Sequence, residues 1–223
     1  MSTKGLSIPF WSPAEIQAAL RPALEQIELR RVLAYPTETV YGFGGGIDRE
    51  SVDALVKLKR RPPGKPFLLL ISGPHMLDRL DLNLPSYAAQ LVARHWPGPL
   101  TLVLPGGEGR VPPRLRGPEG GIAVRWTSNR STARLIEAHG DALTSTSANR
   151  PGVPPATATT EILAQWPGAI ARGILRVLDA GRLAPSAPST VVDCTGRRPR
   201  VIRPGEIPAA VLRDTVPTLI GDA

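Results

Sequence analysis

A continuous apolar run from Phe67 to Ile71 is the feature that most constrains the fold. Five consecutive apolar residues have the length of a strand, and they suit a strand that is buried on both faces. Before and after this run, strand-like segments alternate with segments of helical periodicity along nearly the whole chain. This order predicts an α/β fold with an open, twisted, mixed or mostly parallel sheet and flanking helices.

The periodicity and the flanking residues also place the individual elements. Ser12 and Glu15 form a capping box around Pro13, which predicts a helix of about four turns that ends near Arg30. The glycines at 42–46 are expected to form a flexible turn before the second helix. The later helices are predicted at about 52–59, 86–95, 132–138 and 160–166, and the strands at 32–35, 67–71, 100–104, 122–126, 142–145, 175–178, 190–193 and 200–202.

Prolines and glycines mark the loops between these elements. The chain has 25 prolines and 22 glycines in 223 residues, and they concentrate at 105–121, 150–158 and 181–188. The sequence contains no internal repeat, low-complexity linker or long charge run that would mark a domain boundary. We therefore expect one domain over residues 1–223, with a core from about 12 to 213.

The charge of the chain points to an anionic partner or substrate. Lysine and arginine number 27 against 19 acidic residues, which gives a net charge of +8, and both nucleotides and nucleic acids suit such a protein. Only four of the basic residues are lysines, yet Lys57, Lys59 and Lys65 fall within nine positions. Compact ammonium groups are common at phosphate-binding sites. The alternative is a solvated helix face, on which Lys59 and Arg61 would be exposed.

Several other classes of site are not expected. The dinucleotide fingerprint fails at Ile47, and the phosphate loop fails because Pro66 follows Gly64 and Lys65. The single cysteine, Cys194, is expected in the core, and the three histidines are too isolated to bind zinc. We therefore expect neither NAD nor zinc. The absence of an apolar run of membrane length and of a secretory signal predicts a cytoplasmic protein without a membrane partner.

Two polar segments follow predicted strands, where α/β proteins usually bind ligands. One places Thr37 and Thr39 after the strand at 32–35, and their side chains point the same way if that strand continues. The other runs from Thr144 to Asn149 and offers hydroxyl and amide groups in a row. Taken singly, the first could be a strand-to-helix turn and the second a Ser/Thr turn with an asparagine cap.

Seven blocks in one order, however, together resemble the YrdC-type threonylcarbamoyl-AMP synthase family. Their order and spacing match from about residue 12 to 213, and the chain ends soon after the last block, which resembles the short single-domain form without a further C-terminal domain. The blocks are YPTETVYGFGGG at 35–46, KLKRRPPGKP at 57–66, WPGPLTLVL at 96–104, AVRW at 123–126, STSANRPG at 145–152, STVVD at 189–193 and RPGEI at 203–207.

The resemblance implies a large basic cleft and a specific reaction. L-Threonine, bicarbonate and ATP would yield threonylcarbamoyl-AMP and pyrophosphate. ATP would be a substrate in this reaction, and Mg²⁺ is expected as a cofactor. A separate transferase complex would then move the threonylcarbamoyl group to an adenosine of tRNA. Whether the chain itself touches tRNA, and which oligomer it forms, stay open at this point.

The resemblance also assigns roles to residues of this chain. The catalytic residues would be Lys59 and Arg61. ATP would bind to Arg61, Lys65, Ser145, Ser147, Asn149 and Arg203, and threonine to Thr39, Arg125 and Ser189.

The chain departs from the family pattern at two places, and other functions compete. Leu70 stands where many relatives have a histidine that contacts threonine, and Trp126 and Thr127 follow Arg125 in place of an Arg-x-Pro motif. The alternative function is a non-catalytic module that binds double-stranded RNA or tRNA, although 4% aromatic residues supply few stacking platforms. Carbamoyltransferases with a related domain are much longer and carry cysteine pairs, which this chain lacks.

Overall fold

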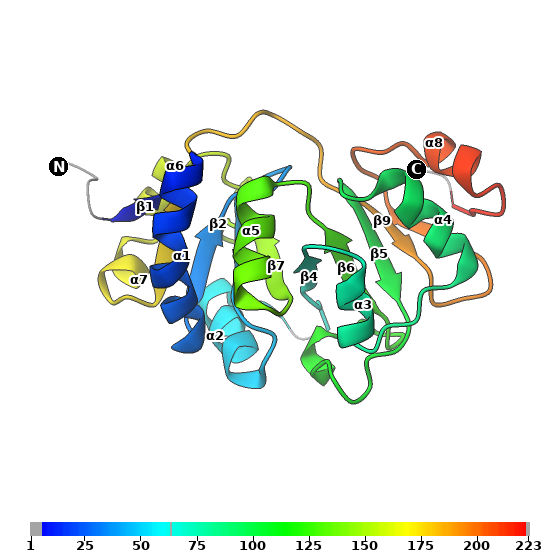
Figure 1. The fold of residues 1–223 in the computed structure, drawn as a ribbon, viewed down its shortest axis with the longest axis horizontal. Coiled ribbons are helices and arrows are strands. Elements are labelled where there is room, and N and C mark those ends of the chain that lie inside the picture. Colours follow the sequence, from blue (N-terminus) through cyan, green and yellow to red (C-terminus); the bar gives the residue numbers. More distant parts are fainter. Residues whose placement is uncertain (1–5, 63, 222–223) are drawn as a thin grey trace.

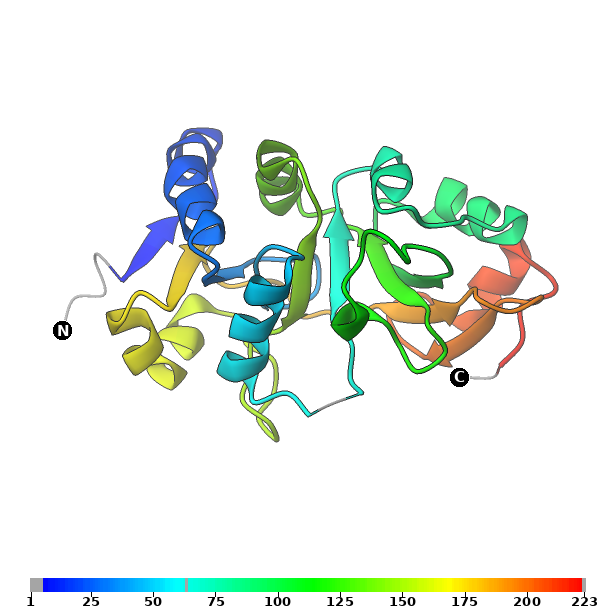
Figure 2. The ribbon, with the colours of Figure 1, turned by 90° about the horizontal axis from the view of Figure 1, so that it is seen from below.

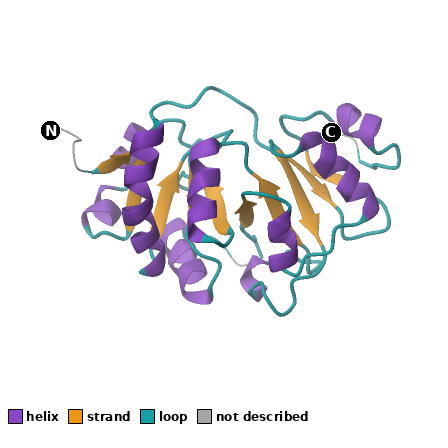
Figure 3. Ribbon diagram, in the orientation of Figure 1, coloured by secondary structure: helices purple, strands orange, loops and turns teal. Residues whose placement is uncertain are grey.

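A single mixed sheet organises the residues that the computed structural model describes, 6–62 and 64–221 (Figures 1 and 3). Within them the sheet has ten strands, and four of its nine neighbouring pairs are parallel. In spatial order the strands are β1 (Ser7–Pro9), β8 (Leu175–Asp179), β2 (Val32–Tyr35), β3 (Gly42–Gly44), β7 (Leu143–Ser147), β4 (Leu68–Ile71), β6 (Ile122–Trp126), β5 (Leu100–Leu104), β9 (Thr190–Asp193) and β10 (Arg200–Arg203).

Helices flank both faces of this sheet. In Figure 2, α1, α5, α3 and α4 line up on one side, and α2, α6 and α7 lie on the other side toward the β1 end. The α/β class with an open mixed sheet is therefore confirmed, while the single domain over residues 1–223 stays a prediction. The helices are α1 (Pro13–Glu28), α2 (Arg49–Lys59), α3 (His75–Arg79), α4 (Ser86–His95), α5 (Arg130–His139), α6 (Thr159–Gln165), α7 (Pro167–Ala171) and α8 (Ala209–Thr215), with a 3-10 turn η1 (Pro113–Leu115).

Local sequence signals set the position of most elements. The capping box forms as predicted, since the Glu15 amide donates to Ser12 Oγ and the Ser12 amide donates to Glu15 Oε2 at 2.8 Å. The apolar run is buried as predicted except at Leu68, which is half-buried. Strand β4, at the centre of the sheet, takes its fully buried residues Leu69, Leu70 and Ile71 from this run. The short elements β1, α3, α7 and α8 were not predicted, because three to seven residues carry little periodicity.

The prediction of a flexible turn at 42–46 was wrong, because Gly42–Gly44 form strand β3. This strand pairs antiparallel with β2 on one side and with β7 on the other. An added Cβ at Gly44 would collide with the Thr144 carbonyl oxygen and with the Tyr35 hydroxyl, which themselves form a 2.7 Å hydrogen bond. Glycine is present here for close backbone approach, and residues 36–41 become a hairpin loop.

Two further expectations concern the core and membranes. Cys194 is buried as predicted, and this burial, followed by the nearby Asp193, raises the pKa of its thiol to about 12. Among the described residues, no helix has the length and hydropathy needed to cross a bilayer.

Candidate active site

A cavity of about 680 Å³ lies against the middle of the sheet. Leu68, Ala123, Arg125 and Ser145 line it from β4, β6 and β7, and the register pairs Leu68 with Ser145 across two of these strands. The hairpin loop at 36–41 and the segment at 186–189 close its sides. Seven of the predicted site residues line this cavity, and they are Thr39, Arg61, Arg125, Ser145, Ser147, Ser189 and Arg203.

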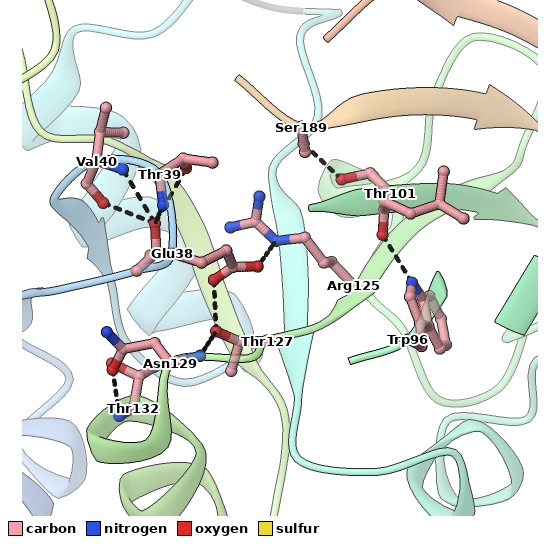
Figure 4. A network of polar contacts seen from close by, with 12 residues as sticks. Glu38, Thr39, Val40, Trp96, Thr101, Arg125, Thr127, Asn129, Thr132 and Ser189 are labelled. Carbon is pink, nitrogen blue, oxygen red and sulfur yellow. Dashed lines mark hydrogen bonds and ion pairs between the residues drawn. The ribbon is translucent and has the colours of Figure 1, made fainter. Parts of the chain in front are cut away.

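Arg125 is the best-defined cation of the cavity. It is 4% exposed, and its Nε lies 3.1 Å from Glu38 Oε1, while Glu38 Oε2 accepts a 2.7 Å hydrogen bond from the Thr127 hydroxyl (Figure 4). The two terminal nitrogens of Arg125 make no hydrogen bond or ion pair within the part of the chain that the structure describes. Glu38 therefore fixes the guanidinium through one edge and leaves its terminal pair of N–H groups for a ligand.

Glu38 was missed from the sequence, although it lies inside the 35–46 block. The signal was a buried arginine on a strand, which needs a carboxylate partner at low dielectric. Thr127, one of the two residues that replace the Arg-x-Pro motif, anchors that carboxylate. The departure near Arg125 thus supplies a hydroxyl that the ion pair uses.

Thr37 and Thr39 lie side by side at the mouth of the hairpin loop. Both are buried and line the cavity, and their Oγ1 atoms are 3.2 Å apart. Thr37 Oγ1 donates to the Val40 carbonyl at 2.7 Å, so the Thr39 hydroxyl donates to Thr37. The remaining lone pair of Thr39 is free to accept a hydrogen bond from a ligand, whereas Thr37 holds the loop.

Ser189 and Arg203 form the opposite wall of the cavity. Ser189 Oγ is 2.9 Å from Thr101 Oγ1, and Arg203 Nη2 donates to the Ser189 carbonyl at 2.7 Å and to its Oγ at 3.0 Å. Partial burial and then the charge of Arg125 lower the pKa of Arg203. Arg203, predicted to bind ATP, therefore lies beside a residue that was predicted to bind threonine.

Lys59 and Asn149 stand behind the cavity rather than in it. The ammonium of Lys59 donates to the Ser147 carbonyl at 2.8 Å, to Asn149 Oδ1 at 3.0 Å and to the Asn149 carbonyl. Lys59 is 7% exposed, so the expectation of an exposed side chain was wrong; the 147–149 segment covers it. Desolvation, followed by the charge of Arg61, lowers the pKa of Lys59 to about 8.

Arg61 reaches the cavity, but Lys65 does not. Arg61 donates to Thr146 Oγ1 at 3.0 Å and to the carbonyls of Lys65 and Pro66, and its guanidinium lies 4.6 Å from the centre of the Phe67 ring. Lys65 is exposed and lines a separate cavity of about 330 Å³, of which Arg61 is also part. Arg61 therefore stands between the two openings.

Leu70 occupies the position of the family histidine without entering the cavity. It is fully buried and pairs in register with Arg125 on the neighbouring strand. Leu68, two residues earlier on the same face of β4, is the residue that lines the cavity. A leucine at position 70 therefore offers no hydrogen bond to a ligand, in contrast to the histidine expected from the family pattern.

Comparison with known proteins agrees with this geometry. A family model described as telomere recombination, that of Sua5, YciO and YrdC, matches residues 25–205. The chain belongs to the Sua5/YciO/YrdC family. The family that the seven blocks indicated is thereby confirmed.

Several members of the Sua5/YciO/YrdC family are close enough for a direct comparison. The threonylcarbamoyl-AMP synthase of Pyrococcus abyssi is 34% identical over 85% of this chain, which spans only 54% of that relative. The synthase of Marinobacter nauticus is 35% identical, and the match covers 82% of this chain and 93% of the relative. The crystal structure of P. abyssi Sua5 in complex with L-threonine superposes with a TM-score of 0.86 at 31% identity, covering 96% of this chain and 62% of that one.

Proposed function

We propose that the chain is a threonylcarbamoyl-AMP synthase, a nucleotidyltransferase that converts L-threonine, bicarbonate and ATP into threonylcarbamoyl-AMP and pyrophosphate. Both relatives above carry this name. The observation that carries the proposal is the cavity itself. Three arginines, Arg61, Arg125 and Arg203, share it with a set of hydroxyl groups, and the described residues that line it include no carboxylate. Such a cavity suits substrates with several anionic groups.

Threonine would bind at the Arg125 end of the cavity. The terminal nitrogens of Arg125 match a carboxylate in a two-point contact, and Glu38 holds them in place. Thr39 would accept a hydrogen bond from the substrate, and Ser189 would offer its hydroxyl from the opposite wall. The threonine nitrogen would form an N–C bond to the carbon of bicarbonate with loss of water, and the resulting carbamate would point toward the middle of the cavity.

ATP would bind at the end formed by Arg61 and the strand end of β7. Ser145 and Ser147 line the cavity there, and Lys59 and Asn149 lie one hydrogen bond behind Ser147. A carbamate oxygen attacks the α-phosphorus, and pyrophosphate leaves from the opposite side. Arg203, beside Ser189, would stabilise charge where carbamate and phosphate meet. Lys65 would reach the phosphates only from the rim.

The protein contributes position and charge rather than a covalent nucleophile in this mechanism. Mg²⁺ would enter as part of MgATP, because hydroxyls and arginines, which make up the polar lining, do not replace carboxylate ligands. The product would pass to a transferase complex that modifies tRNA in the cytoplasm. The cavity would then be the floor of the basic cleft expected from the sequence.

Pyrophosphate release tests the proposal. The purified chain is supplied with MgATP, bicarbonate and each of the twenty amino acids in turn, and threonine is expected to give the fastest release. Serine lacks only a methyl group and should be used better than alanine, which also leaves hydroxyl partners unpaired. Tight tRNA binding at 200 mM salt without threonine-dependent release would favour the RNA-binding module instead.

A further inference from the structure

A second cavity, of about 780 Å³, lies between α2 and the α6–α7 pair. Lys57 and Lys59 line it from α2, and Trp166 and Arg172 line it from the other side. Its volume is typical of sites for small molecules. The proposed reaction places its substrates elsewhere, since all the hydroxyl groups assigned to them line the first cavity. Of the residues assigned to the reaction, Lys59 is the one that lines the second cavity.

The charge of this second cavity is strongly one-sided. Four of its cations are exposed, and Lys59 is buried. Within the described chain, no carboxylate lies within ion-pair distance of any of the five. An anion that carries several negative oxygens would satisfy these cations together. The cations are Lys57, Lys59, Arg60, Arg150 and Arg172, and Glu50 is the one acidic residue in the lining.

The surroundings of Trp166 help to decide whether the ligand of this second cavity is an aromatic base or a phosphate. The Arg150 guanidinium lies over its ring at 5.0 Å, and the Phe43 ring packs against it nearly at a right angle, with the ring centres 5.3 Å apart. A nucleobase that stacked on the face next to Arg150 would have to displace this guanidinium. The Nε1–H of Trp166, however, is buried and has no acceptor in the structure. The lining therefore offers a ligand several cations rather than an open aromatic face, which suits phosphate oxygens.

The cavity is connected to the first one through Lys59. The ammonium of Lys59 donates to the Ser147 carbonyl, and Ser147 lines the first cavity while Lys59 lines the second. Arg150, in the second cavity, directly follows Asn149, which accepts from the same ammonium. We propose that the second cavity binds a small oligophosphate, of the class of pyrophosphate or triphosphate, at a site separate from the proposed ATP site.

Calorimetric titration with inorganic pyrophosphate at constant ionic strength tests this site without turnover. Because pyrophosphate is also the product proposed for the first cavity, each titration is repeated in the Arg203→Gln background, where the binding that remains reports the second cavity. The variant Lys57→Gln/Arg172→Gln removes one cation from each wall, and both residues are exposed, so the fold is expected to persist. It should bind pyrophosphate about 10-fold to 100-fold more weakly than the wild type. The control, Arg49→Gln/Arg94→Gln, makes the same charge change at exposed residues outside the cavity and should bind like the wild type.

Two further variants separate this site from the first cavity. Arg203→Gln alters the first cavity and should keep the pyrophosphate affinity of the second. Trp166→Phe keeps a ring against Arg150 but loses the N–H, and it should abolish the fluorescence change that pyrophosphate causes in the wild type. Equal weakening in the two double variants, or loss of binding in Arg203→Gln alone, overturns the proposal. So does binding of a short oligoribonucleotide in place of pyrophosphate, which would assign the cations to a nucleic-acid surface.

Discussion

Arg125 and Lys59 are the only buried charged residues in the part of the chain that the structure describes, and the protein holds them in opposite ways. Arg125 has a carboxylate partner in Glu38. Lys59 has three oxygen acceptors on the 147–149 segment, none of which carries a charge. The first arrangement fixes a permanent charge before a substrate arrives, and the second leaves a charge that titrates and favours an incoming anion.

Removing Glu38 should produce the largest effect, because it leaves Arg125 buried without its counter-charge. We expect Glu38→Ala to lower the free energy of unfolding by about 3 kcal/mol, measured by urea denaturation. The double variant Glu38→Ala/Arg125→Met, which removes both charges, should recover much of this loss. A Glu38→Ala protein as stable as the wild type would show that buried Arg125 needs no carboxylate partner.

Lys59 should matter more for the reaction than for the fold. With an uncharged Met at position 59, we expect threonine-dependent pyrophosphate release to slow about a hundredfold, the usual effect of losing one preorganised charge near reacting phosphates. The free energy of unfolding should fall by about 1 kcal/mol in total, because removing a buried charge offsets much of the loss of its three hydrogen bonds. Lys57→Met, on the same helix but exposed, is the matched control and should keep the wild-type rate. An unchanged rate in Lys59→Met would restrict Lys59 to holding the 147–149 segment.

Threonine binding should depend on the planar, two-point geometry of the Arg125 guanidinium and not only on its charge. Arg125→Lys keeps the charge beside Glu38 but loses the two-point contact, so we expect the KM for threonine to rise about 30-fold. The KM for ATP should change by less than about threefold, because the phosphates lie at the other end of the cavity. Both values come from initial rates of pyrophosphate release. An equal rise in the two KM values would instead place Arg125 on the phosphates.

The sequence predicted the positions of secondary-structure elements better than the burial of single side chains, because the two depend on contacts over different distances along the chain. The capping box and the apolar run at 67–71 act over a few neighbouring residues, so the helix α1 and the strand β4 were placed correctly from local signals. Lys59 was expected on an exposed helix face, but its burial depends on the 147–149 segment, about 90 residues away. Helical periodicity carries no information about such a distant contact.

In the candidate site, too, residues within recognisable sequence blocks were predicted, whereas contacts between distant segments were not. Most of the residues that line the first cavity come from blocks whose resemblance to the family was visible in the sequence, and seven of them were named there. Glu38 was overlooked because its role requires the register that brings Arg125 opposite the hairpin loop. The position of Arg203 beside Ser189 likewise depends on how β10 folds back on β9.

The smallest effect concerns pH and separates the two cations most directly. The folded chain holds the pKa of Lys59 at about 8, against an ordinary value of 10.5. Between these values the unfolded chain binds the proton and the folded chain does not, so this group adds stability as pH rises from about 8 to 10.5 and loses it as pH falls back. Activity should change in the opposite direction as pH rises, because Lys59 becomes neutral above about pH 8 and its charge is needed for phosphate binding.

We therefore expect kcat/KM for ATP to fall above pH 8, by about tenfold at pH 9, because this ratio reports ionisations of the free enzyme. Lys59→Arg keeps its charge throughout this range, so its lower activity should stay flat between pH 7.5 and about pH 9.5. If Lys59→Arg shows the same fall as the wild type, the titrating group is not Lys59, and the contrast between the two cations would rest on geometry alone.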